Sequence, residues 1–181
     1  MGKAHLNFYC RMKKKFVYCL ILFCAIILQT SILPLISPSQ VTGDVVLMFI
    51  LAGSIIDGFF AFFWWSIFAG IIYDLVGYST VGVHALIFLL VLYFVSFFSR
   101  RFSVELRGVG LALFGIFVLA ATLLSQAIVT LVIAWDLQNL HGYSKEFGSF
   151  GDIGIQIFYN TLLFLFCFVV FKKVKKFFAI N

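Results

Sequence analysis

Two side chains that commonly take part in proton transfer stand in the otherwise apolar stretch GIIYDLVGYSTVGVHAL, residues 70–86. Asp74 and His84 flank a short turn-like segment that contains the hydroxyl groups of Ser79 and Thr80. Serine, histidine and aspartate can form the nucleophile, base and orienting group of an acyl-transfer site. In one short loop, however, this combination arises from composition more often than from catalysis. We therefore expect no catalytic residue here. We interpret His84 as a group that caps or hydrogen-bonds the start of the next helix, and a role in binding a proton or substrate is the alternative.

The sequence contains no motif typical of phosphate, metal or nucleic-acid binding. The chain has no phosphate-binding loop, no HExxH motif, and no zinc-type spacing among its four cysteines. Its net charge of +6 comes from basic residues dispersed between apolar runs, without a nucleic-acid-binding motif. We expect neither a metal nor a cofactor, and no nucleic-acid partner.

The composition indicates whether this protein is surrounded by water or by a membrane. Hydrophobic residues make up 64% of its 181 residues and charged residues only 11%, whereas soluble domains carry about 25% charged residues. The mean hydropathy is +1.14. So apolar a chain cannot cover a water-facing surface, and we predict a single all-α domain embedded in a membrane.

The apolar runs predict six transmembrane helices, at about residues 16–35, 45–56, 59–75, 82–98, 106–135 and 153–171. Residues 1–15 form a basic amino-terminal segment and residues 172–181 a basic carboxy-terminal one. Between residues 45 and 75 the apolar run could be one long helix, or two short helices that meet at the turn signal Asp57-Gly58.

The distribution of basic residues decides between these alternatives. With six spans, the five basic residues before Phe16, the three in RRFSVELR and the four in KKVKK all face the cytoplasm, which leaves only Lys145 outside. With five spans, seven of the thirteen would lie on the outer side. The positive-inside rule therefore predicts six spans with both termini inside.

Small and polar residues recur at helical spacing within the predicted spans. Ser66, Gly70 and Asp74 share one face of the third span. The fifth span carries a longer row, and the sixth a shorter one: Gly108, Ala112, Gly115, Leu119, Thr122, Gln126 and Thr130, then Gln156, Asn160 and Cys167. Such rows let helices approach closely and hydrogen-bond in a membrane. Two interpretations stay open, packing inside the bundle and docking of another protein's transmembrane helix.

The pattern AGIIYDLVGYSTVGVHAL resembles the signature of the MreD family of bacterial rod-shape proteins. A glycine, Gly70, precedes an aspartate by four residues, and Gly82-x-His84-Ala-Leu opens the next span. The segments ILQTSILPLI and YNTLLFLFCFVVFKKVKK are similar to the end of the family's first helix and to its last helix. Gly43 departs from the family pattern, which has proline before the aspartate that is Asp44 here.

The resemblance implies a multi-pass protein of the bacterial cytoplasmic membrane, with a fold like that of the membrane S-subunits of energy-coupling-factor transporters. It also implies a non-catalytic scaffold that binds MreC, a single-span protein, and is linked through it to MreB, RodA and a class B penicillin-binding protein. The alternative implied by the same fold is a subunit that binds a vitamin-like small molecule. Together with the bilayer itself, these are the partners that we expect.

Overall fold

The computed structural model describes residues 2–36, 43–77, 80–99, 109–137 and 150–177, and every regular element within these ranges is a helix. In chain order the elements are α1 (Gly2–Ile27), a π-helical turn η1 (Leu28–Ile32), α2 (Leu33–Ile36), α3 (Val45–Asp57), α4 (Phe59–Val76), α5 (Val83–Ser99), α6 (Val109–Leu137) and α7 (Phe150–Phe177). The all-α class predicted from the sequence is confirmed for the described part of the chain.

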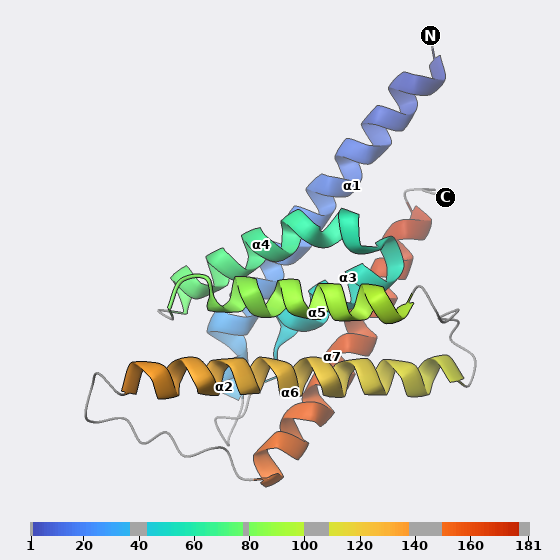
Figure 1. Cartoon of the computed structure of the whole chain (residues 1–181). Coiled ribbons are helices and arrows are strands. Elements are labelled where there is room, and N and C mark those ends of the chain that lie inside the picture. The colour runs from blue at the N-terminus through green and yellow to red at the C-terminus, as the bar shows by residue number, and fades with distance from the viewer. Residues whose placement is uncertain (1, 37–42, 78–79, 100–108, 138–149, 178–181) are drawn as a thin grey trace.

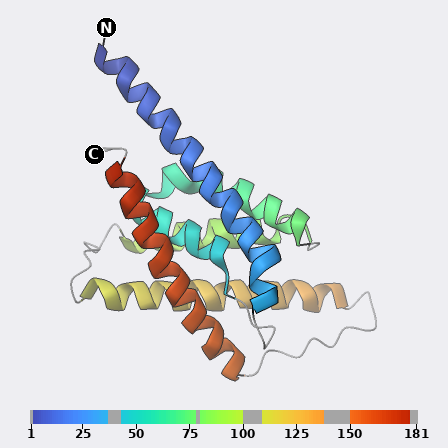
Figure 2. The same cartoon turned by 180° about the vertical axis from the view of Figure 1, so that it is seen from behind.

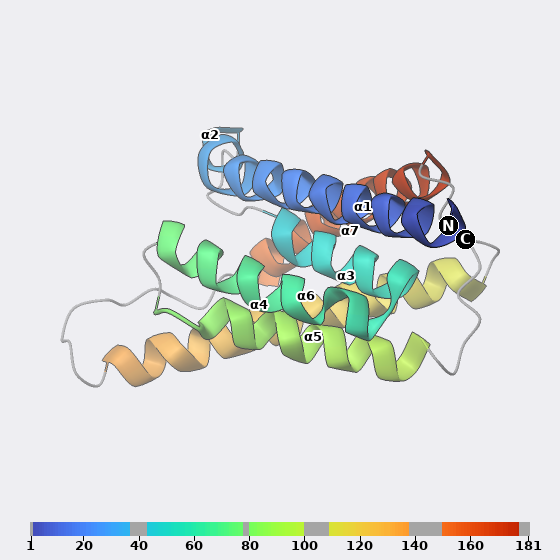
Figure 3. The same cartoon turned by 90° about the horizontal axis from the view of Figure 1, so that it is seen from above.

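The helices form two layers with α3 between them. Helices α4, α5 and α6 run nearly parallel to one another in one layer, and α1 and α7 cross behind them (Figure 1). The view from behind shows α1 and α7 side by side, and α3 lies between them and farther from the viewer (Figure 2). Seen from above, both chain ends lie at the same end of the bundle (Figure 3).

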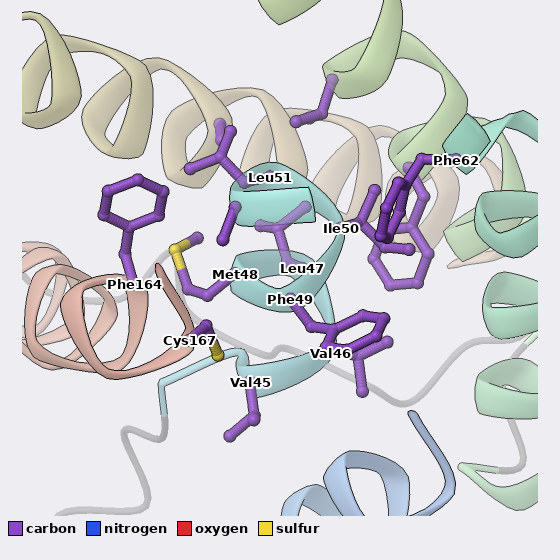
Figure 4. Close-up of a cluster of buried hydrophobic side chains, with 14 of the residues drawn as sticks. Val45, Val46, Leu47, Met48, Phe49, Ile50, Leu51, Phe62, Phe164 and Cys167 are labelled. Atoms are coloured by element: carbon purple, nitrogen blue, oxygen red, sulfur yellow. The ribbon is translucent and has the colours of Figure 1, made fainter. Parts of the chain in front are cut away.

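Helix α3 is the centre of the core. Its residues from Val45 to Ser54 are all buried, whichever side of the helix they occupy. Phe164 and Cys167 of α7 and Phe62 of α4 pack around it (Figure 4). A helix that is hydrophobic all round must be enclosed on every side. At 13 residues α3 is only about 20 Å long, shorter than the hydrocarbon layer, which is tolerable because other helices shield it from lipid.

The helix break predicted at Asp57-Gly58 is present. Helix α3 ends at Asp57 and α4 begins at Phe59, with Gly58 at a φ of 87°. This positive φ suits glycine, which lacks the Cβ that disfavours it in other residues. The turn brings α4 back alongside the core.

The outer helices expose large apolar side chains, as a lipid-facing surface requires. Within the described residues, four stretches are suited by length and composition to cross a membrane: Lys15–Leu35, Phe59–Val76, Phe114–Val132 and Gly151–Phe177. The apolar helices Val45–Asp57 and Val83–Phe98 are shorter. The protein is thus a multi-pass membrane protein, while the six spans and their orientation stay predictions.

Candidate functional site

Asp74, the acid that stood out in the sequence, fastens the end of α4 to the beginning of α5. Its side chain is fully buried. One carboxylate oxygen accepts a hydrogen bond from the backbone N–H of Gly82 at 2.7 Å, and the backbone N–H of His84 lies 3.2–3.3 Å from both oxygens. The first N–H groups of a helix have no partner within the helix, and Gly82 has no side chain with which to cap them. Asp74 therefore caps α5 from the neighbouring helix.

His84 completes this cap. Its Nδ1 atom lies 2.5 Å from Oδ1 of Asp74. A carboxylate can only accept, so Nδ1 carries the proton that is shared in this contact. The ring also packs edge-on against Tyr73, with centroids 4.5 Å apart. We expected His84 to cap or hydrogen-bond the start of this helix, and the contacts divide these roles: Asp74 is the cap, and His84 supplies donors to it.

Gly70 and Gly82 make this arrangement possible. Gly82 has a φ of 101°, in the region that favours glycine. A Cβ atom on Gly70 would collide with the backbone of Ala85, so the two helices touch main chain to main chain at this point. Ser66, one turn earlier on the same face, is also buried, and its hydroxyl donates to the Phe62 carbonyl. The small-residue row of this span is thus a contact surface inside the bundle.

A second set of polar contacts surrounds the start of α3. The Asp44 side chain caps its own helix by accepting from the Leu47 N–H at 2.9 Å. The Asp44 N–H donates to the side-chain oxygen of Asn160 on α7, and the Val45 N–H donates to that of Gln29 in η1, both at 2.7 Å. The backbone N–H groups at the start of α3 are therefore hydrogen-bonded by side chains from three parts of the chain.

Two further bonds anchor the side chains that hold α3. The Gln29 amide donates to the carbonyl of Gly43 at 3.0 Å. The Asn160 amide donates to Thr122 of α6 at 2.9 Å, and the Thr122 hydroxyl donates in turn to the Val118 carbonyl. Thr122 and Asn160, two of the predicted residues, are thereby brought together, and α6 is joined to α7.

These two sets of contacts form one cluster. The ring of Tyr73 packs against His84 and lies near Gln29 of η1, and Asp44 lies near His84. The cluster therefore connects η1, α3, α4, α5, α6 and α7. We call these residues the polar latch: Gln29, Asp44, Tyr73, Asp74, Gly82, His84, Thr122 and Asn160.

Gln29, Asp44 and Tyr73 were not among the predicted site residues. Gln29 reaches the latch from a π-helical turn that precedes Pro34. Proline has no N–H to donate to the carbonyl four residues earlier, and single π-helical turns occur as bulges inside α-helices. The signal that could have found Gln29 is a polar amide in an apolar span, four residues before the Leu33-Pro34 pair.

A third contact, also missed, joins three helices at the opposite end of α3. The Tyr18 hydroxyl of α1 donates to Oδ2 of Asp57 at 2.6 Å, and Lys175 of α7 lies 3.7 Å from Oδ1. Lys175 also approaches the carbonyl of Ile56 at 3.4 Å. The sequence marked Asp57 only as a turn residue. In the structure its carboxylate ties α1 and α7 to the end of the central helix.

The small and polar residues predicted to share one face of the fifth span are partly buried and partly exposed in the structure. Thr122 is buried, and the Gln126 amide donates to Gln156 of α7. Gly115 is exposed, and a Cβ placed on it would meet nothing within 4 Å. The buried face of α6 is instead Phe114, Phe117, Val118, Ala121 and Thr122. Helix α6 crosses α7 at a steep angle, so only its middle reaches that helix (Figure 1). Gly108 lies outside the described residues, as does the side chain of Ala112.

Within the described residues, every buried side-chain nitrogen or oxygen has a hydrogen-bonding partner. No group of three or more His, Cys, Asp or Glu side chains in these ranges is placed to hold a metal ion. The buried polar groups therefore use their bonding capacity on helix ends and neighbouring helices, as polar groups in a membrane interior must.

Comparison with known proteins identifies the family of this chain. No curated protein and no solved structure matches the chain, so the likeness to transporter S-subunits stays a prediction. The family model described as rod shape-determining protein MreD matches residues 10–174, which is nearly the whole chain. The match extends from the third turn of α1 to the last turn of α7 and includes every residue of the polar latch. The chain therefore belongs to the MreD family of rod shape-determining membrane proteins.

Proposed function

We propose that this protein is a non-catalytic assembly subunit of the bacterial elongation machinery. In this role it binds the single-span protein MreC in the cytoplasmic membrane. Through MreC it links the MreB cytoskeleton to RodA and a class B penicillin-binding protein, and so controls where side-wall peptidoglycan is made. Family membership supports a part in rod-shape determination.

One observation carries the non-catalytic part of this proposal. Asp74 and His84, the pair best suited to chemistry, are bound to each other and to the first N–H groups of α5. An acid–base pair that serves catalysis needs a position from which it can exchange a proton with a substrate. Here the carboxylate is fully buried and its contacts hold two helices together, which favours a structural role.

Copurification tests the scaffold. The protein and the MreC of its host, coexpressed and extracted in mild detergent, are expected to elute as one complex. Gly115→Leu is an informative variant, because Gly115 is exposed and has space around it. If the exposed part of the α6 row is the docking surface, this variant should lose MreC while the protein stays folded. Failure of the unmodified protein to bind any MreC of its host would reject the proposal.

The proposed orientation places both termini in the cytoplasm. The two chain ends lie at the same end of the bundle, which is compatible with this orientation (Figure 3). Single cysteines introduced at Lys176 and at Thr80, in a background without the native cysteines, allow labelling with a membrane-impermeant maleimide. We expect Thr80→Cys to react in intact spheroplasts and Lys176→Cys to react only after lysis. The reverse pattern would overturn the orientation.

A further inference from the structure

Helices α1 and α7 run side by side toward the end of the bundle that holds both termini (Figure 2). The ring of Tyr18 meets that of Phe171 edge-on, with centroids 5.1 Å apart. Tyr18 and Lys175 also bind the two oxygens of the same carboxylate, Asp57. These contacts place the next turn of each helix side by side.

Lysines occupy both of these turns. On α1, Lys13 and Lys15 precede Tyr18 and are exposed. On α7, Lys172, Lys173 and Lys176 follow Phe171 and are exposed as well. Helix α1 contains no acidic residue, and in α7 the acid Asp152 is at the opposite end. Asp57 already pairs with Lys175 and has a buried side chain. The five exposed lysines therefore form a basic surface without a neutralising acid on either helix.

An apolar surface begins directly beside these lysines. On α1, Phe16 and Leu20 are 70% and 56% exposed. On α7, Phe166 and Val169 are 67% and 51% exposed, within two turns of Lys172. The Lys172 ammonium itself lies 5.0 Å from the ring of Phe168, so its stem follows the helix toward the apolar side. Charge and apolar area thus follow one another along both helices.

We propose that this rim, formed by Lys13, Lys15, Lys172, Lys173 and Lys176, binds the phosphate headgroup of an anionic phospholipid. The phosphate is held by the lysines, and the acyl chains lie along the exposed apolar residues of α1 and α7. Basic clusters at the membrane end of a helix attract anionic lipids, with each residue contributing about a fivefold change in affinity. This site is separate from the binding of MreC, and neither proposal depends on the other.

The apolar neighbours favour a lipid over a soluble acidic peptide. A peptide in the aqueous phase would use the lysines alone, and the exposed Phe16 and Leu20 would add nothing to its affinity. A phospholipid carries both parts of the complement, a negative phosphate and apolar acyl chains. The two kinds of ligand can therefore be separated by removing the chains.

Native mass spectrometry of the delipidated full-length protein tests the site with three probes. Phosphatidylglycerol is expected to be retained, while phosphatidylcholine and the chain-free headgroup glycerophosphoglycerol are not. Equal retention of phosphatidylcholine would overturn the charge argument. Retention of the chain-free headgroup, or full displacement of the lipid by hexaglutamate, would overturn the lipid argument in favour of a soluble anion or an acidic peptide.

A matched pair of variants locates the site. The triple change Lys172→Gln, Lys173→Gln and Lys176→Gln leaves Lys175 and its contact with Asp57 in place, and should weaken phosphatidylglycerol binding by about 100-fold. The control removes the same charge from the predicted cytoplasmic arginine loop through Arg100→Gln, Arg101→Gln and Arg107→Gln, and should retain binding. An unchanged affinity in the lysine variant, or an equal loss in both, would reject this location. If the lysine variant does not fold, Lys173→Gln alone is expected to lower the affinity about fivefold, and no change would count against the site.

Discussion

Substitution of Gly70 by alanine is the sharpest test of the α4–α5 contact. A Cβ at this position would meet the Cα and the backbone nitrogen of Ala85 well inside van der Waals contact. These are main-chain atoms, so no side-chain rotation can relieve the collision, and α5 must move as a whole. That movement would also stretch the bonds from Asp74 to Gly82 and His84.

The expected magnitude follows from two opposing effects. Overpacking in a close-packed interior costs about 1–3 kcal/mol. Alanine in place of glycine within a helix gains up to about 1 kcal/mol from its better helix propensity. Because the colliding atoms belong to the backbone, we expect the upper part of the first range, and a net loss of about 2 kcal/mol for Gly70→Ala.

Gly115→Ala is the matched control. Gly115 also lies inside a helix, but a Cβ there meets nothing within 4 Å. The control should therefore be neutral or slightly stabilising. Thermal unfolding in detergent, followed by fluorescence-detected size-exclusion chromatography, should show a lower midpoint for Gly70→Ala alone. Equal midpoints for the two variants would refute the claim that α4 and α5 touch through their backbones.

Substitutions at three further positions test the other contacts in the same assay. Asp74→Asn should cost only about 1 kcal/mol of unfolding free energy, because an amide still accepts from the helix end and can donate to His84. Asp74→Ala should cost about 3 kcal/mol, because it leaves buried N–H groups unpaired. Equal effects of the two variants would show that the charge itself matters. Asn160→Ala should cost about 2–4 kcal/mol, since it removes the acceptor of the Asp44 N–H and leaves a cavity. An unchanged midpoint would contradict the role of Asn160 in holding the start of α3. Tyr18→Phe should cost about 1.5–3 kcal/mol by removing the hydroxyl bond to Asp57 while keeping the ring, and no change in midpoint would show that this bond contributes nothing.

The helical class and the break at Gly58 could be predicted because they follow from local properties. Long apolar runs and a glycine after an aspartate carry this information in adjacent residues. The face shared by Ser66, Gly70 and Asp74 follows in the same way from helical periodicity, and all three are buried.

The contacts that depend on the crossing of helices could not be predicted in this way. Gly115 and Thr122 belong to one periodic row, yet one is exposed and the other buried, because α6 meets α7 only over its middle. Gln29 and Asp57 looked unremarkable, since their partners are distant in the sequence and a single chain does not reveal which helices are neighbours. Periodicity indicates which residues share a face, but not what that face meets.

The enclosed position of α3 has a consequence for how the protein is made. Both ends of this helix are held in part by α7: the Asp44 N–H by Asn160, 116 residues later, and the Ile56 carbonyl by Lys175, 119 residues later. During translation the centre of the molecule is therefore inserted long before its last supports have emerged from the ribosome. A chain that stops before α7 would hold an unsupported helix within the bilayer, which membrane proteases can recognise. The core is thus complete only once α7 has been made, so that chains without α7 should not accumulate.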